Sequence, residues 1–126
     1  MRNTFGKEEK LKKRNLIADL FAKGKFISVP PIQLVYMETD HDSSYKIQAG
    51  VSVSKKRFNK AVQRNQIKRF MRDAYRLNKQ LIYESEDTKK HIFMFIYQGS
   101  RIPSFDEMNI KMRMLLEKFL KKNKSL

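Results

Sequence analysis

The segment from Lys55 to Lys79 constrains the fold of this chain more than any other stretch. Placed on a helix at about 100° per residue, six apolar side chains of this segment and the residues just after it fall within an arc of roughly 120°. They are Ile67, Phe70, Met71, Ala74, Leu77 and Leu81. The opposite side spans an arc of about 140°. It carries Arg64, Asn65, Lys68, Arg69, Arg72 and Arg76. The pattern predicts an amphipathic helix over residues 60–83, with one face on a core and the other toward an anionic partner.

The charge on this face indicates a phosphate-binding surface. The segment holds ten basic residues and one acid, Asp73. An unbroken four-residue spacing links Arg64, Lys68, Arg72 and Arg76. Like charges at this spacing repel each other, whereas faces that are only solvated usually mix signs. Simple solvation is the alternative, but the series favours a polyanion, and nucleic acid is the polyanion we expect.

The length and composition predict one domain over residues 1–126, with residues 1–6 and 122–126 as loose ends. The formal net charge of +15 indicates nucleic acid or an anionic membrane as partner. The chain lacks a long apolar run and tryptophan, which makes a membrane the weaker choice. It has no cysteine and no secretory apolar region after its first residues. We therefore expect a cytoplasmic protein.

Apolar periodicity predicts six elements. They are helices over residues 7–23, 60–83 and 104–121, and strands over residues 32–37, 45–53 and 91–97. The first two strands flank a turn-rich segment, so an antiparallel hairpin is expected, and the third strand is apolar on both faces. Ser104 and Glu107 fit a capping box. The order α-β-β-α-β-α predicts a small sheet with packed helices in the α+β class.

Residues that could carry catalysis or bind a metal are sparse. His41 lies between two aspartates, and solvated turn polarity is favoured there over a weak metal site. His91 opens a strand and is interpreted as an edge polar residue. The acids of residues 84–87 could hold a metal only weakly. No phosphate loop and no nucleophile–base pair are found, so no catalytic residue is assigned and any enzyme activity is expected to belong to a complex.

Three stretches of the sequence resemble the protein component of bacterial ribonuclease P. The first is Val51-Ser52-Val53-Ser54-Lys55-Lys56, and the second runs from Ala61-Val62-x-Arg64-Asn65-x-Ile67-Lys68-Arg69 to Arg72-Asp73-Ala74-Tyr75-Arg76. The third is the opening segment, with Lys10-Leu11, Ile17, Leu20-Phe21 and Gly24. The resemblance covers roughly residues 5–120, and the predicted order of elements agrees with it.

The resemblance implies a subunit of an endoribonuclease that removes the 5′ leader of precursor tRNA. The RNA subunit would carry the active site with its Mg²⁺, and the protein, a monomer bound 1:1, would hold that RNA and the leader. By position, the contacts to catalytic RNA would be Lys55, Lys56, Arg64, Asn65, Lys68, Arg69, Arg72 and Arg76. The charge pattern adds Arg57 and Lys60 to this set. The leader cleft would be lined by Ile17, Phe21, Leu34 and Tyr36.

Several points stay open in the sequence. Gln66 stands where the family pattern has arginine, which predicts weaker affinity, and Ile17 stands where an aromatic residue is common. Asn65 could bond RNA or fix the helix start, and Phe21 and Tyr36 could be core or cleft. The resemblance implies a left-handed crossover between strands, whereas the general rule favours the right-handed one.

Two other classes of protein compete with this reading. A non-enzymatic RNA-binding module, ribosomal or assembly-related, explains the charge but not the order of the motif. A protein–protein adaptor is disfavoured by the net charge of +15.

Overall fold

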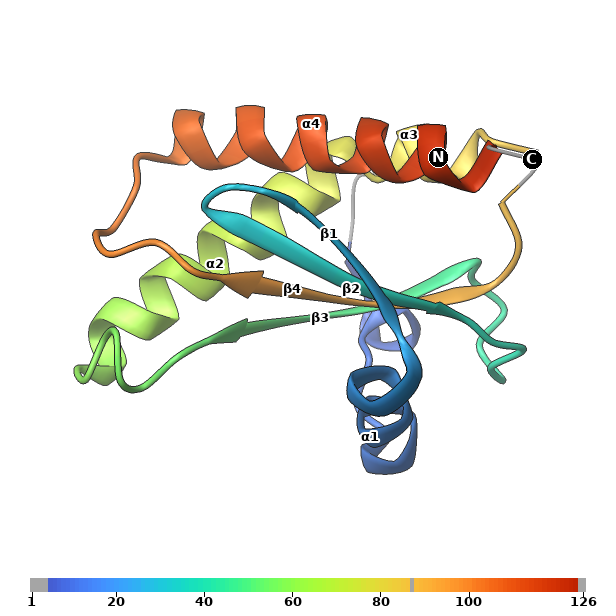
Figure 1. Ribbon diagram of the computed structural model, residues 1–126, viewed down its shortest axis with the longest axis horizontal. Helices are drawn as coiled ribbons and strands as arrows, with labels where there is room; N and C mark the ends of the chain where they lie inside the picture. Colours follow the sequence, from blue (N-terminus) through green and yellow to red (C-terminus); the bar gives the residue numbers. More distant parts are fainter. Residues whose placement is uncertain (1–4, 87, 125–126) are drawn as a thin grey trace.

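The computed structural model describes residues 5–86 and 88–124. Its centre is a four-stranded sheet in the order β1-β2-β4-β3 (Figure 1). The strands are β1 (Lys25–Val29), β2 (Ile32–Glu38), β3 (Ile47–Val53) and β4 (His91–Tyr97). β1–β2 and β2–β4 are antiparallel, and β3–β4 is parallel. The α+β class is therefore confirmed.

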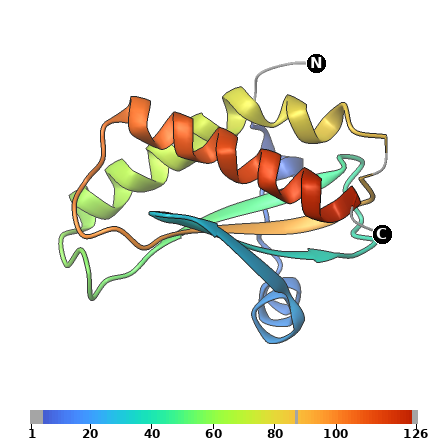
Figure 2. The ribbon, with the colours of Figure 1, turned by 45° about the horizontal axis from the view of Figure 1, so that its top comes forward.

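Helices cover both faces of this sheet. One face carries α2 (Ala61–Asn78), α3 (Gln80–Tyr83) and α4 (Phe105–Lys124), and the other carries α1 (Arg14–Lys23) (Figure 1). In the views of Figures 1 and 2, the chain leaves β3, passes over the sheet through α2 and enters β4 in a left-handed sense. The crossover has the hand that the family resemblance implied.

The predicted hairpin of residues 32–37 and 45–53 is wrong. The hairpin partner of β2 is β1, whose Val29 is paired with Ile32 across the cis Pro30-Pro31 peptide. β4 lies between β2 and β3, where an apolar strand is buried on both faces, as its sequence predicted. No strand was predicted before residue 32, although the two prolines of Pro30-Pro31 suit a turn between two strands.

The predicted helix over residues 7–23 is also wrong in its first half. A 3₁₀ turn covers Lys7–Glu9, an extended segment follows, and α1 begins only at Arg14. Lys10 forms a parallel bridge with Ala49, and the Leu11 N–H donates to the Ala49 carbonyl at 2.9 Å. These bonds to the edge of β3 replace the helical ones. We call residues 5–13 the strap.

The other predicted helices differ from the structure at their ends. The helix over 60–83 is interrupted at Lys79, between α2 and α3. α4 continues to Lys124, so the predicted loose end at residues 122–124 is wrong, and residues 1–4 and 125–126 lie outside the described residues. At its start, the Glu107 N–H donates to Ser104 Oγ at 3.1 Å. The Glu107 carboxylate accepts from Arg101 at 2.9 Å, so only half of the capping box is confirmed.

The core has two layers, one on each side of the sheet. Between the sheet and α2 and α4, the Phe93 ring packs edge-on against Phe119 with centroids 4.9 Å apart. Between the sheet and α1 lies a smaller cluster of buried side chains. It consists of Leu11, Leu20, Val35, Ile92 and Met94. The larger layer holds α2 rigidly on the sheet, and the smaller layer holds α1.

Candidate RNA-binding surface and groove

The helix α2 presents one apolar and one basic face. Ile67, Met71 and Ala74 are fully buried, as the helical periodicity predicted. Leu77 is 42% exposed and lies outside the core, whereas Tyr75 takes part in it with 1% exposure. The apolar face is therefore turned slightly from the predicted one, because the ring of Tyr75 packs on Phe95.

The opposite face of α2 carries the predicted cations. Arg69 and Arg72 are exposed, while Arg64, Lys68 and Arg76 are half-buried. The Arg69 guanidinium donates to Gln66 Oε1 at 3.1 Å and lies 5.8 Å from the centre of the Phe70 ring. The residue that departs from the family pattern thus binds a neighbouring arginine of the same helix.

The loop before α2 extends this basic face. Lys55, Lys56, Arg57 and Lys60 are exposed on it. With Asn65 and the five cations of α2, they form what we call the basic strip. Its members are Lys55, Lys56, Arg57, Lys60, Arg64, Asn65, Lys68, Arg69, Arg72 and Arg76. All ten predicted residues therefore lie on one loop and the helix that follows it.

Two arginines of the strip also hold the loop in place. Arg57 Nη1 donates to the Gln98 carbonyl at 2.6 Å, and Arg64 Nη1 donates to the Phe58 carbonyl at 2.8 Å. Phe58 is buried next to Tyr97. A guanidinium has five N–H donors, so each arginine keeps donors for a ligand. No sequence pattern indicated these structural bonds.

The predicted cleft of Ile17, Phe21, Leu34 and Tyr36 is wrong as a set. Leu34 is fully buried, and Tyr36 packs edge-on against Phe119 of α4 with centroids 5.0 Å apart. Both point to the α4 side of the sheet, whereas Ile17 packs with the α1 layer. Alternate residues of a strand face opposite sides, so the β2 residues that accompany Ile17 are Val35 and Met37.

A groove does exist beside Ile17, between the strap, α1, the edge of β3 and α2. Its volume is about 310 Å³. We call it the strap groove; it is lined by Phe5, Lys10, Leu11, Lys12, Ile17, Ala49, Gly50, Val51, Arg72 and Met94. The lining combines apolar side chains with three cations. Arg72 belongs to both the basic strip and the groove, so the two surfaces adjoin.

Two exposed aromatic side chains lie on the α1 side of the molecule. Phe21 is 53% exposed, which excludes the core role left open for it. Phe26 is 66% exposed and is paired with Val35, so it points to the face that carries α1. Phe26 was missed because β1 was missed; the alternation of residues 25–29 was the signal that could have found it.

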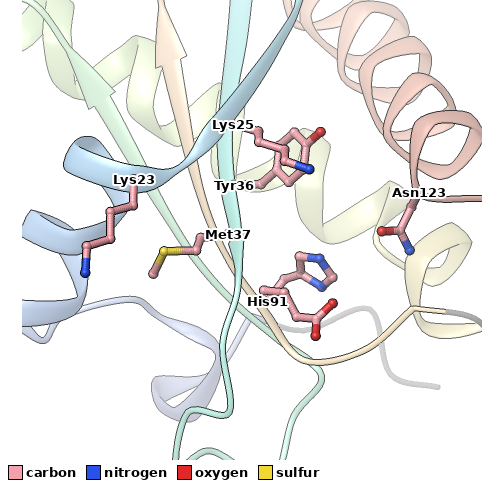
Figure 3. A pocket seen from close by; sticks show the side chains of 7 residues that line it. Lys23, Lys25, Tyr36, Met37, His91 and Asn123 are labelled. Atoms are coloured by element: carbon pink, nitrogen blue, oxygen red, sulfur yellow. The ribbon is translucent and has the colours of Figure 1, made fainter. Parts of the chain in front are cut away.

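A smaller cavity of about 170 Å³ lies at the end of β2 where the strand finishes with Glu38 (Figure 3). Its lining comes from the ends of α1 and α4 and from three strands, and comprises Lys23, Lys25, Tyr36, Met37, Glu38, His91 and Asn123.

Both histidines differ from their predicted environments. His91 is 3% exposed and packs edge-on against Phe119, so its interpretation as an edge polar residue is wrong. His41 is also buried, with Nε2 3.2 Å from the Lys46 carbonyl, and is not a solvated turn residue.

Because His91 is buried, its protonation should change the free energy of unfolding of the protein. Desolvation lowers the pKa of His91, against the opposing effects of its bond to Lys89 and the charge of Glu38. The unfolded chain therefore binds this proton more tightly, so the free energy of unfolding should fall as the pH drops below about 6.5. Urea denaturation at about pH 7 and pH 5 should show a smaller loss for His91→Phe than for the wild type. If the wild type and His91→Phe lose the same free energy of unfolding, His91 is not a source of this pH dependence.

Within residues 5–86 and 88–124, no three His, Asp or Glu side chains gather into a metal-binding group. Of the acidic segment 84–87, Asp87 lies outside the described residues. No helix in the described part of the chain is long and apolar enough to cross a membrane.

Comparison with known proteins gives consistent matches. The family model described as Ribonuclease P matches residues 5–120. The "Ribonuclease P protein component" of Porphyromonas gingivalis is 46% identical over 82 residues, which cover 63% of this chain and 59% of that protein. The chain thus spans less than two thirds of that relative. The protein of the same description from Chlorobium phaeobacteroides is 37% identical over 116 residues, covering 82% of this chain and 80% of its own.

Solved structures match the fold. The ribonuclease P protein of Thermotoga maritima superposes with a TM-score of 0.70 at 23% identity, covering 87% of this chain and 96% of that one. The Staphylococcus aureus protein gives a TM-score of 0.61 at 24% identity, with 94% and 97% covered.

Proposed function

This chain belongs to the ribonuclease P family, and we propose that it is the protein component of that enzyme. In this role it binds the catalytic RNA and the 5′ leader of precursor tRNA, and promotes endonucleolytic removal of the leader. The observation that carries the proposal is the basic strip, displayed on a helix whose other face is fixed in the core.

The chemistry of the strip suits a folded RNA. Recognition of RNA helices depends on phosphates, 2′-hydroxyls and shape, and a rigid helix with several arginines offers donors at fixed spacing. A guanidinium binds phosphate oxygens through two parallel hydrogen bonds or stacks on a base. Asn65 is exposed at the start of this face, where its amide can bond a ribose hydroxyl or a base edge.

The strap groove suits a single strand. Proteins that bind single-stranded nucleic acid combine aromatic side chains, on which bases stack, with a positively charged groove along the backbone. Here Phe5 supplies an aromatic ring beside the apolar surface of Leu11, Ile17 and Met94. Lys10, Lys12 and Arg72 supply charge. We place the leader in this groove. Because Arg72 borders it, the leader and the catalytic RNA would lie on adjoining surfaces.

The family resemblance implies the division of labour that we propose. The RNA subunit carries out the cleavage and holds the Mg²⁺ that supports it, while the protein binds and orients. We propose one protein for each RNA and action in the cytoplasm.

The experiment that tests the function is cleavage of precursor tRNA by a bacterial ribonuclease P RNA at low Mg²⁺, with and without this protein. Faster cleavage at the correct 5′ end is expected. A protein that binds this RNA without stimulating cleavage would instead be a non-enzymatic RNA-binding module.

Phe21 provides a test of the α1 side of the molecule. Because its side chain is 53% exposed, Phe21→Ala should change the melting temperature little. If the leader stacks on this side, the affinity of the holoenzyme for leader-bearing precursor should fall about tenfold, since one base–aromatic contact contributes about 1–3 kcal/mol. The affinity for mature tRNA, measured in parallel, should not change. Unchanged affinity for the precursor would mean that the leader does not stack on Phe21.

A further inference from the structure

A buried ion pair connects the strap to the junction of α2 and α3. Nζ of Lys79 lies 2.6 Å from Oε1 of Glu9, and each side chain is 2% exposed. The hydroxyl of Tyr83 donates to the same oxygen at 3.2 Å, and the Gly6 N–H donates to Oε2 at 3.3 Å. The Glu9 carboxylate therefore has donors from both the strap and the helices, although these are about 70 residues apart in sequence.

Such a pair is an unusual way to fill space in a core. Two apolar side chains of similar volume often give equal or greater stability, because a buried ion pair must overcome the desolvation of both charges. Its directional bonds, however, admit only one arrangement of the two elements they join, as a buried polar residue does in a coiled coil. The two elements here are the strap and the end of α2.

The other contacts of the strap lead directly to α1. The Glu8 carbonyl accepts from Ser43 Oγ at 2.8 Å and from Gln48 Nε2 at 3.1 Å, and Leu11 is bonded to the edge of β3. α1 then begins at Arg14 without a side-chain cap and fully buries only Leu20. The position of α1 therefore depends on the position of the strap.

The two elements that this ion pair joins both contribute to the lining of the strap groove. Lys10 and Leu11 of the strap form one wall, and Arg72 of α2 lies on the other. Glu9 directly precedes the first wall, and Lys79 follows Arg72 by about two helical turns on α2. A bond between Glu9 and Lys79 thus fixes the separation of the walls.

We propose that Glu9 and Lys79 are positioning residues that set the width of the strap groove for single-stranded RNA. They touch neither the RNA nor the reacting atoms. They act through Lys10, Leu11 and Arg72, and they couple the groove to the helix that carries the basic strip. This inference rests on the proposed function, because it concerns the leader bound in the same groove.

The test compares two precursor tRNAs, with a long leader and with a single-nucleotide leader, bound to reconstituted holoenzyme. In Glu9→Gln and in the double variant Glu9→Gln/Lys79→Met, the preference for the long leader should fall about tenfold, the scale of coupling through remote residues. The affinity for ribonuclease P RNA alone should not change. The double variant removes both charges, so it keeps the test valid if the single variant fails to fold.

Two further measurements separate positioning from stability. The chain has no cysteine, so spin labels at Ala18→Cys in α1 and Val62→Cys in α2 report the distance between these helices. This distance distribution should shift or broaden in the Glu9 variants. Leu115→Ala, a core variant in α4, serves as a control that lowers stability while the Glu9–Lys79 pair is kept, and it should keep the leader preference.

The outcomes are distinct. Unchanged leader preference and unchanged spin-label distances in the double variant would overturn the inference, as would an equal loss of preference in Leu115→Ala. If the wild-type protein neither stimulates cleavage nor favours a long leader, the proposed function itself fails, together with this inference.

Discussion

Replacing Lys68, Arg69 and Arg72 together with glutamine should lower the affinity for ribonuclease P RNA about a thousandfold, at roughly tenfold for each charge-assisted hydrogen bond lost. The slope of log K against log salt should become shallower by about two to three units, close to one for each phosphate contact. Glutamine keeps a long polar stem and good helix propensity, so α2 should remain folded. Titration of labelled RNA at several salt concentrations measures both quantities.

A matched variant gives this prediction its control. Lys118, Lys121 and Lys122 are exposed on α4 and outside the basic strip, and their replacement by glutamine removes the same net charge. Binding through the strip predicts a small effect for this variant. If both triple variants lose the same affinity and the same slope, the protein attracts RNA by its overall charge and the strip has no special role.

Arg64 is left out of this triple variant because its side chain also stabilises the loop before α2. Its bond to the Phe58 carbonyl supports the loop that carries Lys55, Lys56 and Arg57. Loss of RNA binding in an Arg64 variant would therefore mix a lost phosphate contact with a displaced loop.

Lys79→Met should lower the free energy of unfolding by about 3–5 kcal/mol, because it leaves the Glu9 carboxylate buried without its cation. Folded domains are stable by only about 5–15 kcal/mol, so this is a large share of the total. In Glu9→Gln/Lys79→Met most of the loss should be recovered, since no buried charge remains. Urea denaturation of the single and double variants near neutral pH measures the difference.

The exposed pair of Lys13 and Asp42 is the control for this result. Its side chains are 54% and 69% exposed, so Lys13→Met should change stability little. A similar loss in Lys13→Met and Lys79→Met would mean that water reaches the Glu9–Lys79 pair. A double variant as unstable as the single one would mean that the pair itself, rather than an unpaired charge, stabilises the fold.

The elements that the sequence predicted best are those whose pattern depends only on themselves. The apolar positions of α2 recur with the helical period, so Ile67, Met71 and Ala74 were assigned to the core and the basic strip to the opposite face. The apolar run of β4 likewise predicted burial on both faces. Each of these is a local property of one segment.

The errors concern partners that are distant in sequence. Alternation in β2 separates Leu34 from Val35 but does not say which face meets α1, and the cleft was assigned to the wrong one. Alternation also gives no pairing, so the insertion of β4 between β2 and β3 was missed. Lys79 appeared to be one more surface cation because its partner, Glu9, lies in the strap.

The central place of β4 has a consequence for the order in which the chain can assemble during synthesis. β4 is the last strand to leave the ribosome, yet it is the one that joins β2 to β3. Until residues 91–97 emerge, β1 and β2 can form only an isolated hairpin, which is marginally stable in water. β3 likewise has no neighbouring strand in the sheet until then. Such non-local pairing slows folding, so a nascent chain that already carries the basic strip should remain open to chaperones and to ribosomal RNA until β4 has emerged.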